Sequence, residues 1–215
     1  RTQDLPADAG DQAEAPRKAW DLLANVPFRR LLLVNWFLSA CWDVHTFVLP
    51  ILGHERGLSA SVIGSLLGAF AIAATLVRML MPLLAERLRE TAVLTGAMLA
   101  TAVLFGIYPL MPTAWAMGLC SVLLGFSLGS VQPMIMSMLH QITPHARQGE
   151  ALGLRLMSVN ASSVVVPLLF GAAGAVVGVG GVFWLAGTVV GLGSRVAWTL
   201  RVEPAAPHQA ADESR

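Results

Sequence analysis

The sequence predicts an all-α membrane protein with six transmembrane helices, and two observations support this fold class. The chain has 215 residues, of which 55% are hydrophobic and only 13% are charged, a composition that excludes a water-soluble globular protein. Its apolar residues also gather in runs long enough to cross about 30 Å of hydrocarbon as helices. The charged residues lie mostly at the two ends and in the turns between these runs.

Apolar runs define the predicted spans, and polar segments define the ends. The spans cover residues 31–52, 62–84, 92–110, 114–139, 151–174 and 182–198, within one domain over residues 28–200. The glycine-rich join at 177–181 separates the last two spans, although its composition is also compatible with one continuous helix. Residues 1–27 are polar and predict a cytoplasmic linker that ends in a short interfacial helix, and residues 201–215 predict a disordered tail.

The basic residues predict the orientation of these spans. One side of the bundle has only Arg56, whereas the other has Arg17, Lys18, Arg29, Arg30, Arg87, Arg89, Arg147, Arg155 and Arg201. Because basic residues gather on the cytoplasmic side of membrane proteins, we expect both termini in the cytoplasm.

The remaining composition argues against several other classes of protein. Cys41 and Cys120 both lie inside apolar runs, so they predict no disulfide framework. No span contains a glycine-x-serine-glycine motif with a partner histidine, a His-Glu-x-x-His motif or paired glutamates, which disfavours an intramembrane hydrolase. We expect no enzymatic activity, no cofactor, no metal site and no nucleic-acid partner.

Small residues predict close helix packing in two of the spans. In and just after the span 62–84, one side of the helix has the small residues Gly64, Ala71, Thr75 and Ala85, together with Arg78 and Pro82. In the fifth span one face has Gly149, Gly153, Asn160, Pro167 and Gly171, and another has Arg155, Ser158 and Ser162. Pro167 can kink this helix, which would serve a gate but is also tolerated in a static helix.

A charged loop follows the span 62–84. Its sequence, Pro82-Leu-Leu-Ala-Glu86-Arg87-Leu-Arg89, resembles the loop motif glycine-x-leucine-alanine-aspartate-arginine-x-glycine-arginine of the major facilitator superfamily. In that family the motif joins the second and third helices of a half on the cytoplasmic side and latches helix ends in one access state. Here Pro82 and Arg89 stand where the family prefers glycine, and Glu86 replaces aspartate. The resemblance implies that Glu86 and Arg87 belong to a cytoplasmic gate.

A second segment extends this resemblance over residues 30–198. The sequence Thr143-Pro-His-Ala-Arg147-Gln-Gly149-Glu-Ala-Leu-Gly153-Leu-Arg155 looks like the cytoplasmic connection between the tenth and eleventh helices of many bacterial members. Together the two segments imply the C-terminal six-helix half of a bacterial transporter, built from two three-helix repeats. Residues 1–27 are then expected to be the remnant of the central loop, and the N-terminal six-helix half is the expected partner.

We assign three further arginines to the same cytoplasmic gate. Arg78 lies about six residues from the end of its span and can snorkel toward the interface, so we interpret it as structural. Arg147 belongs to the second loop. Arg155 either completes a network at the helix end or contacts a substrate.

Of the six predicted spans, the first is the richest in polar side chains that could take part in transport. Asn35, Ser39, Trp42 and Thr46 form a stripe along one side of the helix, and Asp43 and His45 flank it on either side. The reverse face has Phe37, Ala40, Val44 and Val48 and is expected to face lipid.

Asp43 lies near the middle of the bilayer, roughly 18 Å along the helix from the cytoplasmic end. An ionised carboxylate at this depth costs about 2.5–3.5 kcal/mol to insert. It should therefore face water, find a partner or bind a proton. The alternative is a buried, hydrogen-bonded aspartate without a role in transport.

The fourth span offers Gln132 beside Pro133, and Gln132 is either a substrate contact or a hydrogen-bonding residue between helices. In the superfamily the first helix of each repeat lines the central cavity, which implies a substrate and proton pathway of Asn35, Ser39, Trp42, Asp43, His45, Thr46 and Gln132.

We therefore expect a secondary active transporter of a small organic molecule, coupled to protons and embedded in a cytoplasmic (inner) membrane. Its expected partners are the lipid bilayer, the missing half, the substrate and protons. The alternative is a non-transporting membrane sensor or assembly factor on the same scaffold. Substrate identity, import or export, and a twelve-span or six-span complete protein all stay open.

Overall fold

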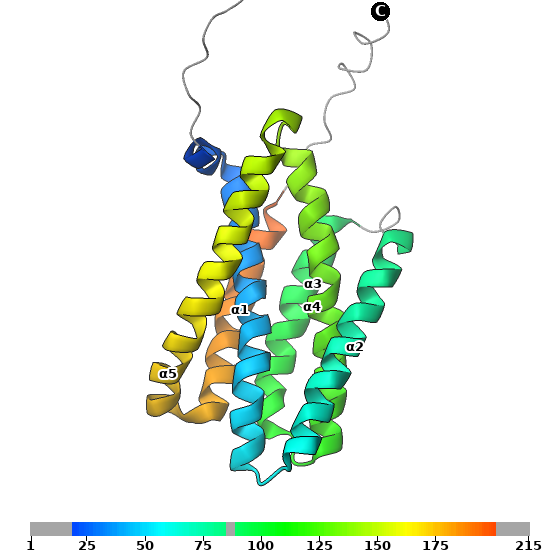
Figure 1. The fold of residues 1–215 in the computed structure, drawn as a ribbon, viewed down its shortest axis with the longest axis vertical. Helices are drawn as coiled ribbons and strands as arrows, with labels where there is room; N and C mark the ends of the chain where they lie inside the picture. Colours follow the sequence, from blue (N-terminus) through cyan, green and yellow to red (C-terminus); the bar gives the residue numbers. More distant parts are fainter. Residues whose placement is uncertain (1–18, 85–88, 201–215) are drawn as a thin grey trace, which may run out of the picture.

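The computed structural model describes residues 19–84 and 89–200, which form helices and short connections (Figure 1). The predicted linker and tail lie largely outside this part of the chain, as do Glu86 and Arg87 of the predicted gate. The elements in chain order are η1 (Ala19–Ala24), α1 (Val26–Glu55), α2 (Ala60–Leu84), α3 (Glu90–Ile107), η3 (Tyr108–Leu110), α4 (Ala114–Ile142), η4 (His145–Arg147) and α5 (Gln148–Trp198).

Five helices among the described residues are long and apolar enough to cross a membrane, which agrees with the prediction of an all-α membrane protein. We predicted six, but residues 151–174 and 182–198 belong to the single element α5. The backbone of α5 leaves helical dihedrals at one residue, Gly178, with φ 76° and ψ 166°. Figure 1 shows the chain turning back there, so that α5 has a descending leg (yellow) and a returning leg (orange).

Capping residues mark the starts of two helices, and only the first of these differs from the start of the predicted span. α1 begins at Val26 because the Asn25 side chain accepts a hydrogen bond from the Phe28 amide at 3.5 Å. α4 begins at Ala114 because the Thr113 hydroxyl accepts one from the Ala116 amide at 3.3 Å. The first helix therefore covers Val26–Glu55 instead of the predicted 31–52.

The helices pack around α4 and α5. α2 lies against α4, α1 lies against α5 and also contacts α4, and α3 lies between α4 and α5. The closest approach is between α2 and α4, where a Cβ atom placed on Gly125 would lie 2.4 Å from the Phe70 carbonyl oxygen. A Cβ atom on Gly129 would lie 2.7 Å from the Ala74 carbonyl oxygen. The small residues that bring these helices together therefore belong mainly to α4.

Three predicted faces differ from the structure. The side of α2 with Gly64, Ala71 and Thr75 is exposed, because Phe70, Ala73 and Ala74 pack against the α4 glycines instead. The glycine face of the fifth span is also open, since a Cβ atom on Gly149, Gly153 or Gly171 would meet nothing within 4 Å. The face of α1 predicted to meet lipid is partly buried, because α5 packs against α1 and both Val44 and Val48 are buried.

The two ends of the bundle hold different connections. In Figure 1 the start of α1, the end of α5 and the η4 turn lie at one end, and the α1–α2 turn, the α3–α4 turn and the turn within α5 lie at the other. At this second end Arg56 donates hydrogen bonds to the carbonyl oxygens of Pro109 and Met111. Arg56 therefore ties the end of α1 to the connection between α3 and α4.

Candidate functional site

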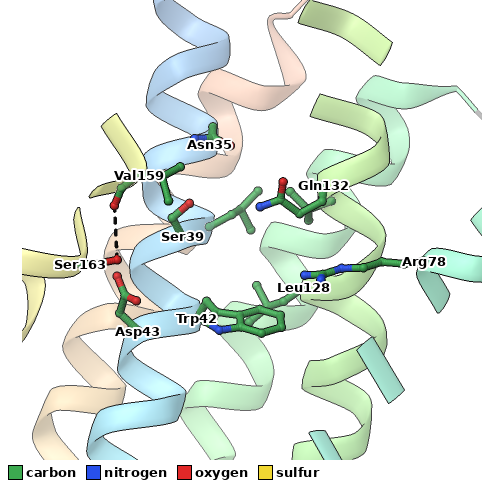
Figure 2. A pocket seen from close by; sticks show the side chains of 11 residues that line it. Asn35, Ser39, Trp42, Asp43, Arg78, Leu128, Gln132, Val159 and Ser163 are labelled. Atoms are coloured by element: carbon green, nitrogen blue, oxygen red, sulfur yellow. Dashed lines mark hydrogen bonds between the residues drawn. The ribbon is translucent and has the colours of Figure 1, made fainter. Parts of the chain in front are cut away.

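A cavity of about 300 Å3 opens between α1, α2, α4 and the descending leg of α5 (Figure 2). Five of the seven residues predicted for the substrate and proton pathway line it, namely Asn35, Ser39, Trp42, Asp43 and Gln132. The first four come from one side of α1, and Gln132 comes from α4. The structure thus brings Asn35 and Gln132 to one cavity, although they are 97 residues apart in the sequence.

Asp43 is the carboxylate of this cavity. Its side chain is only 8% exposed, and the Ser162 hydroxyl donates a hydrogen bond to Oδ2 at 3.3 Å. Figure 2 shows its carboxylate beside Ser163, another lining residue from α5. Within residues 19–84 and 89–200, Asp43 forms no ion pair. Among the described residues, the carboxylate therefore has a hydroxyl partner and no positively charged one.

Arg78 reaches into the same cavity from α2 (Figure 2). Its Cζ atom lies 5.0 Å from the centroid of the Trp42 ring, a cation–π contact. We predicted a structural arginine that snorkels toward a gate at the end of the helix, but the side chain points at Trp42, one position from Asp43. The sequence did indicate this position in one respect, because Arg78 lies on the small-residue side of α2. Helix packing leaves that side open toward the cavity.

Gln132 connects the cavity to a second buried arginine. Arg155 on α5 is 7% exposed and donates a hydrogen bond from Nη2 to Gln132 Oε1. Its Nε atom is buried without a hydrogen-bond partner in the described part of the chain. Gln132 therefore forms a hydrogen bond between α4 and α5, one of the two interpretations made from the sequence, and it also lines the cavity, whereas its contact with a substrate stays a prediction. Arg155 lies behind it.

His45 and Thr46, predicted for the same pathway, do not line the cavity. His45 is fully buried, with its ring centroid 4.4 Å from that of Phe70 and 5.6 Å from that of Tyr108. The Thr46 hydroxyl donates to the Trp42 carbonyl oxygen at 3.0 Å. His45 lies on a part of the α1 surface that turns away from Asp43, where α2 and η3 cover it. Thr46 lies one turn beyond Asp43, and its hydroxyl bonds the backbone of the preceding turn instead of facing the cavity.

The predicted cytoplasmic gate does not form a single cluster among the described residues. Arg147 lies in η4 and pairs with Glu150 at 2.7 Å, three residues further along the chain. Arg78 and Arg155 lie at or behind the cavity instead. Glu86 and Arg87 fall outside the described residues. The structure therefore places Arg78 and Arg155 near the cavity, apart from Arg147, and their role in a gate stays a prediction.

Residues of α5 complete the cavity, and the sequence only partly indicated them. Ser162 was placed on one face with Arg155 and Ser158, which is the face that meets Asp43 and Gln132. Val159 and Ser163 also line the cavity and had no signal of their own. Among the described residues, no group of three histidine, cysteine or acidic side chains lies close enough to hold a metal ion.

Comparison with known protein families identifies the family of this chain. No curated protein matches this chain. The family described as Major Facilitator Superfamily matches residues 31–215, which is most of the sequence. The match includes all the residues that line the cavity. Its members are secondary transporters and not enzymes, which confirms the prediction that this chain has no enzymatic activity. With five long apolar helices and a multi-pass membrane architecture, the chain belongs to the Major Facilitator Superfamily.

Proposed function

We propose that the chain is the C-terminal six-helix half of a secondary transporter that couples a small organic molecule to protons. Family membership supports the transporter class. The observation that carries the rest is Asp43, a carboxylate at the middle of α1 that lines a cavity of about 300 Å3 and forms no ion pair among the described residues. Alternating access to such a group would let it load a proton on one side and release it on the other.

The length of α5 supports six crossings. Its 51 residues would extend roughly 77 Å as one straight helix, more than twice the thickness of a hydrocarbon core. The turn at Gly178 divides it into legs of 148–177 and 179–198, each long enough to cross once. The repeats would then be α1–α3 and α4–α5, and the first helix of each repeat, α1 and α4, contributes to the cavity.

The connections support cytoplasmic termini. The described ends of the chain and the η4 turn share one end of the bundle, which has Arg29, Arg30 and Arg147 (Figure 1). The other end has Arg56. This distribution matches the basic excess found on the cytoplasmic side of a membrane. The resemblance of residues 143–155 to bacterial members of the family favours a bacterial cytoplasmic membrane.

The test is the accessibility of the cavity from each side of the membrane. In the complete protein that contains this chain, single cysteines at Ser39 and Gln132 would be labelled with a membrane-impermeant thiol reagent, in right-side-out and inverted vesicles. Native Cys41 and Cys120 are buried and set a low background, measured in the parent. Leu119→Cys on the outer surface of α4, 63% exposed, is the lipid-facing control.

A transporter predicts that the cavity cysteines are labelled from both sides, because the protein alternates between two open states. The lipid-facing cysteine should react from neither. Labelling of both cavity positions from a single side only, with normal expression, would favour a sensor or assembly factor and contradict the proposal.

A further inference from the structure

Arg78 is a cation held in place without an anion. Its guanidinium lies over the Trp42 ring, yet among residues 19–84 and 89–200 it makes no hydrogen bond and no ion pair. A guanidinium has five N–H donors in a fixed plane, and a contact with a ring uses its face and leaves these donors available. The donors of Arg78 therefore remain available for a ligand in the cavity that it lines.

The accessible charge of the cavity is positive. Asp43 is 8% exposed and already accepts a hydrogen bond from Ser162, whereas Arg78 is exposed and donates no hydrogen bond to another described residue. Arg155, buried behind Gln132 with an unpartnered Nε, adds a second cation beside the same wall. Two arginines against one carboxylate leave a net charge of about +1 even when Asp43 is ionised. A bound anion would balance this charge.

The rest of the lining describes the body of that ligand. Leu38, Leu128, Val131 and Val159 give the cavity an apolar surface beside its polar groups. An acidic group paired with Arg78 would leave the remainder of a small molecule against these side chains, within about 300 Å3. A single exposed arginine fits one planar carboxylate, because the guanidinium can donate two parallel hydrogen bonds to its two oxygens.

We infer that the cavity takes a small organic carboxylate, whose acidic group pairs with Arg78 and whose apolar part lies against Leu128, Val131 and Val159. This inference rests on the proposed transport function, because it names the class of substrate for the same cavity. Arg78 is the residue that selects an anion over a neutral or cationic analogue. Arg155 acts through Gln132 and adds positive potential without touching the ligand.

Three aromatic molecules of similar size and different charge test this inference. Benzoate, benzamide and benzylamine would be titrated into the complete purified protein, and binding would be measured by calorimetry. We expect saturable binding of benzoate and no binding of benzamide or benzylamine at the same concentrations. This comparison uses only the parent protein, so it does not depend on the folding of any variant.

Variants then assign the binding to Arg78. Arg78→Gln should weaken benzoate binding at least about tenfold, because it removes a charged hydrogen bond, and Arg78→Lys should weaken it less. Arg195→Gln, an exposed arginine at the end of α5 outside the cavity, is the matched control and should bind benzoate like the parent.

Several results would overturn the inference. Preference for benzylamine, equal binding of benzamide, absence of benzoate binding at millimolar concentrations, or unchanged benzoate binding by folded Arg78→Gln would each do so. The labelling experiment on Ser39 and Gln132 separates the two proposals. Labelling from both sides together with benzylamine preference would leave a transporter of another substrate class, whereas labelling from one side would contradict transport itself.

Discussion

Three charged side chains at the cavity are each held by an uncharged neighbour. Asp43 accepts a hydrogen bond from Ser162, Arg78 lies over Trp42, and Arg155 donates to Gln132. Charges inside a membrane span are costly and usually pair with one another or face water. None of these charges pairs with its opposite among the described residues, and we propose that a ligand and a proton are their partners. Their separation is the residue-scale basis of both proposals.

The affinity for a carboxylate should depend on the protonation of Asp43. The charged or titratable group that faces Asp43 across the cavity is Arg78 on α2, whereas α4 and α5 present neutral Gln132, Ser162 and Ser163. Protonation of Asp43 removes a negative charge from the cavity, so benzoate should bind more tightly as the pH falls toward the acidic range. By linkage, bound benzoate should favour the protonated form.

Calorimetry at a series of pH values above the ionisation of benzoate itself checks this expectation. Asp43→Asn is neutral at every pH, so it should bind benzoate as tightly as the protonated parent and with little pH dependence. The same pH dependence in the parent and in Asp43→Asn would show that another group is responsible.

The contact between α2 and α4 decides which side of α2 faces the cavity. Gly125 and Gly129 let the α2 backbone approach α4 closely, and Ala73 and Ala74 fill the gap. This packing turns the opposite, small-residue side of α2 with Arg78 outward, toward the cavity. The orientation of Arg78 is therefore a consequence of two glycines on another helix.

A methyl group at Gly129 should separate the two helices. Its Cβ atom would lie 2.6 Å from Val77 Cγ1 and 2.7 Å from the Ala74 carbonyl oxygen, and the backbone of α2 cannot yield as a side-chain end can. We expect Gly129→Ala to destabilise the protein by about 1–3 kcal/mol. Gly96→Ala on α3 is the control, since its Cβ atom would meet nothing within 4 Å.

Thermal unfolding of the two variants in detergent measures this difference. Gly96→Ala should match the parent or exceed it slightly, because alanine favours a helix more than glycine does. Equal melting temperatures for Gly129→Ala and the parent would mean that α2 and α4 are not in the close contact described.

Sequence reasoning predicted what lies within one helix better than what several helices build together. Asn35, Ser39, Trp42 and Asp43 were found because the helical period alone places them near one another. The position of Arg78 in the cavity was missed because the rotation of α2 about its axis depends on the glycines of α4. The sixth helix was predicted from composition, but its separation from the fifth depends on the dihedral angles of one residue, Gly178, within a stretch rich in glycine.

At the scale of the whole molecule, the described bundle leaves polar and small surfaces uncovered. Arg78 is exposed, and so are the faces of α2 with Gly64 and Ala71 and of α5 with Gly153. Lipid cannot hydrate an arginine at the depth of Trp42, and small residues favour a close helix neighbour. A second helical unit that covers these surfaces, as in a complete transporter, would enclose the cavity between two halves.

We propose that Asp43 couples transport to protons in the complete protein that contains this chain. Asp43→Asn keeps the size and hydrogen-bonding capacity of the side chain but fixes it in a neutral form. An obligatory proton carrier that cannot release or load a proton should lose accumulation driven by a proton gradient. It should still fold and still exchange substrate down a gradient, because neither step needs net proton movement.

The most direct test measures accumulation against a gradient in vesicles that contain the complete protein, using the carboxylate that binds best. Glu55→Gln, an exposed carboxylate at the end of the same helix, is the control and should accumulate substrate like the parent. We expect Asp43→Asn to abolish accumulation while substrate exchange continues. Accumulation by Asp43→Asn to the level of the parent, with the same pH dependence, would contradict it and leave Asp43 as a buried structural residue.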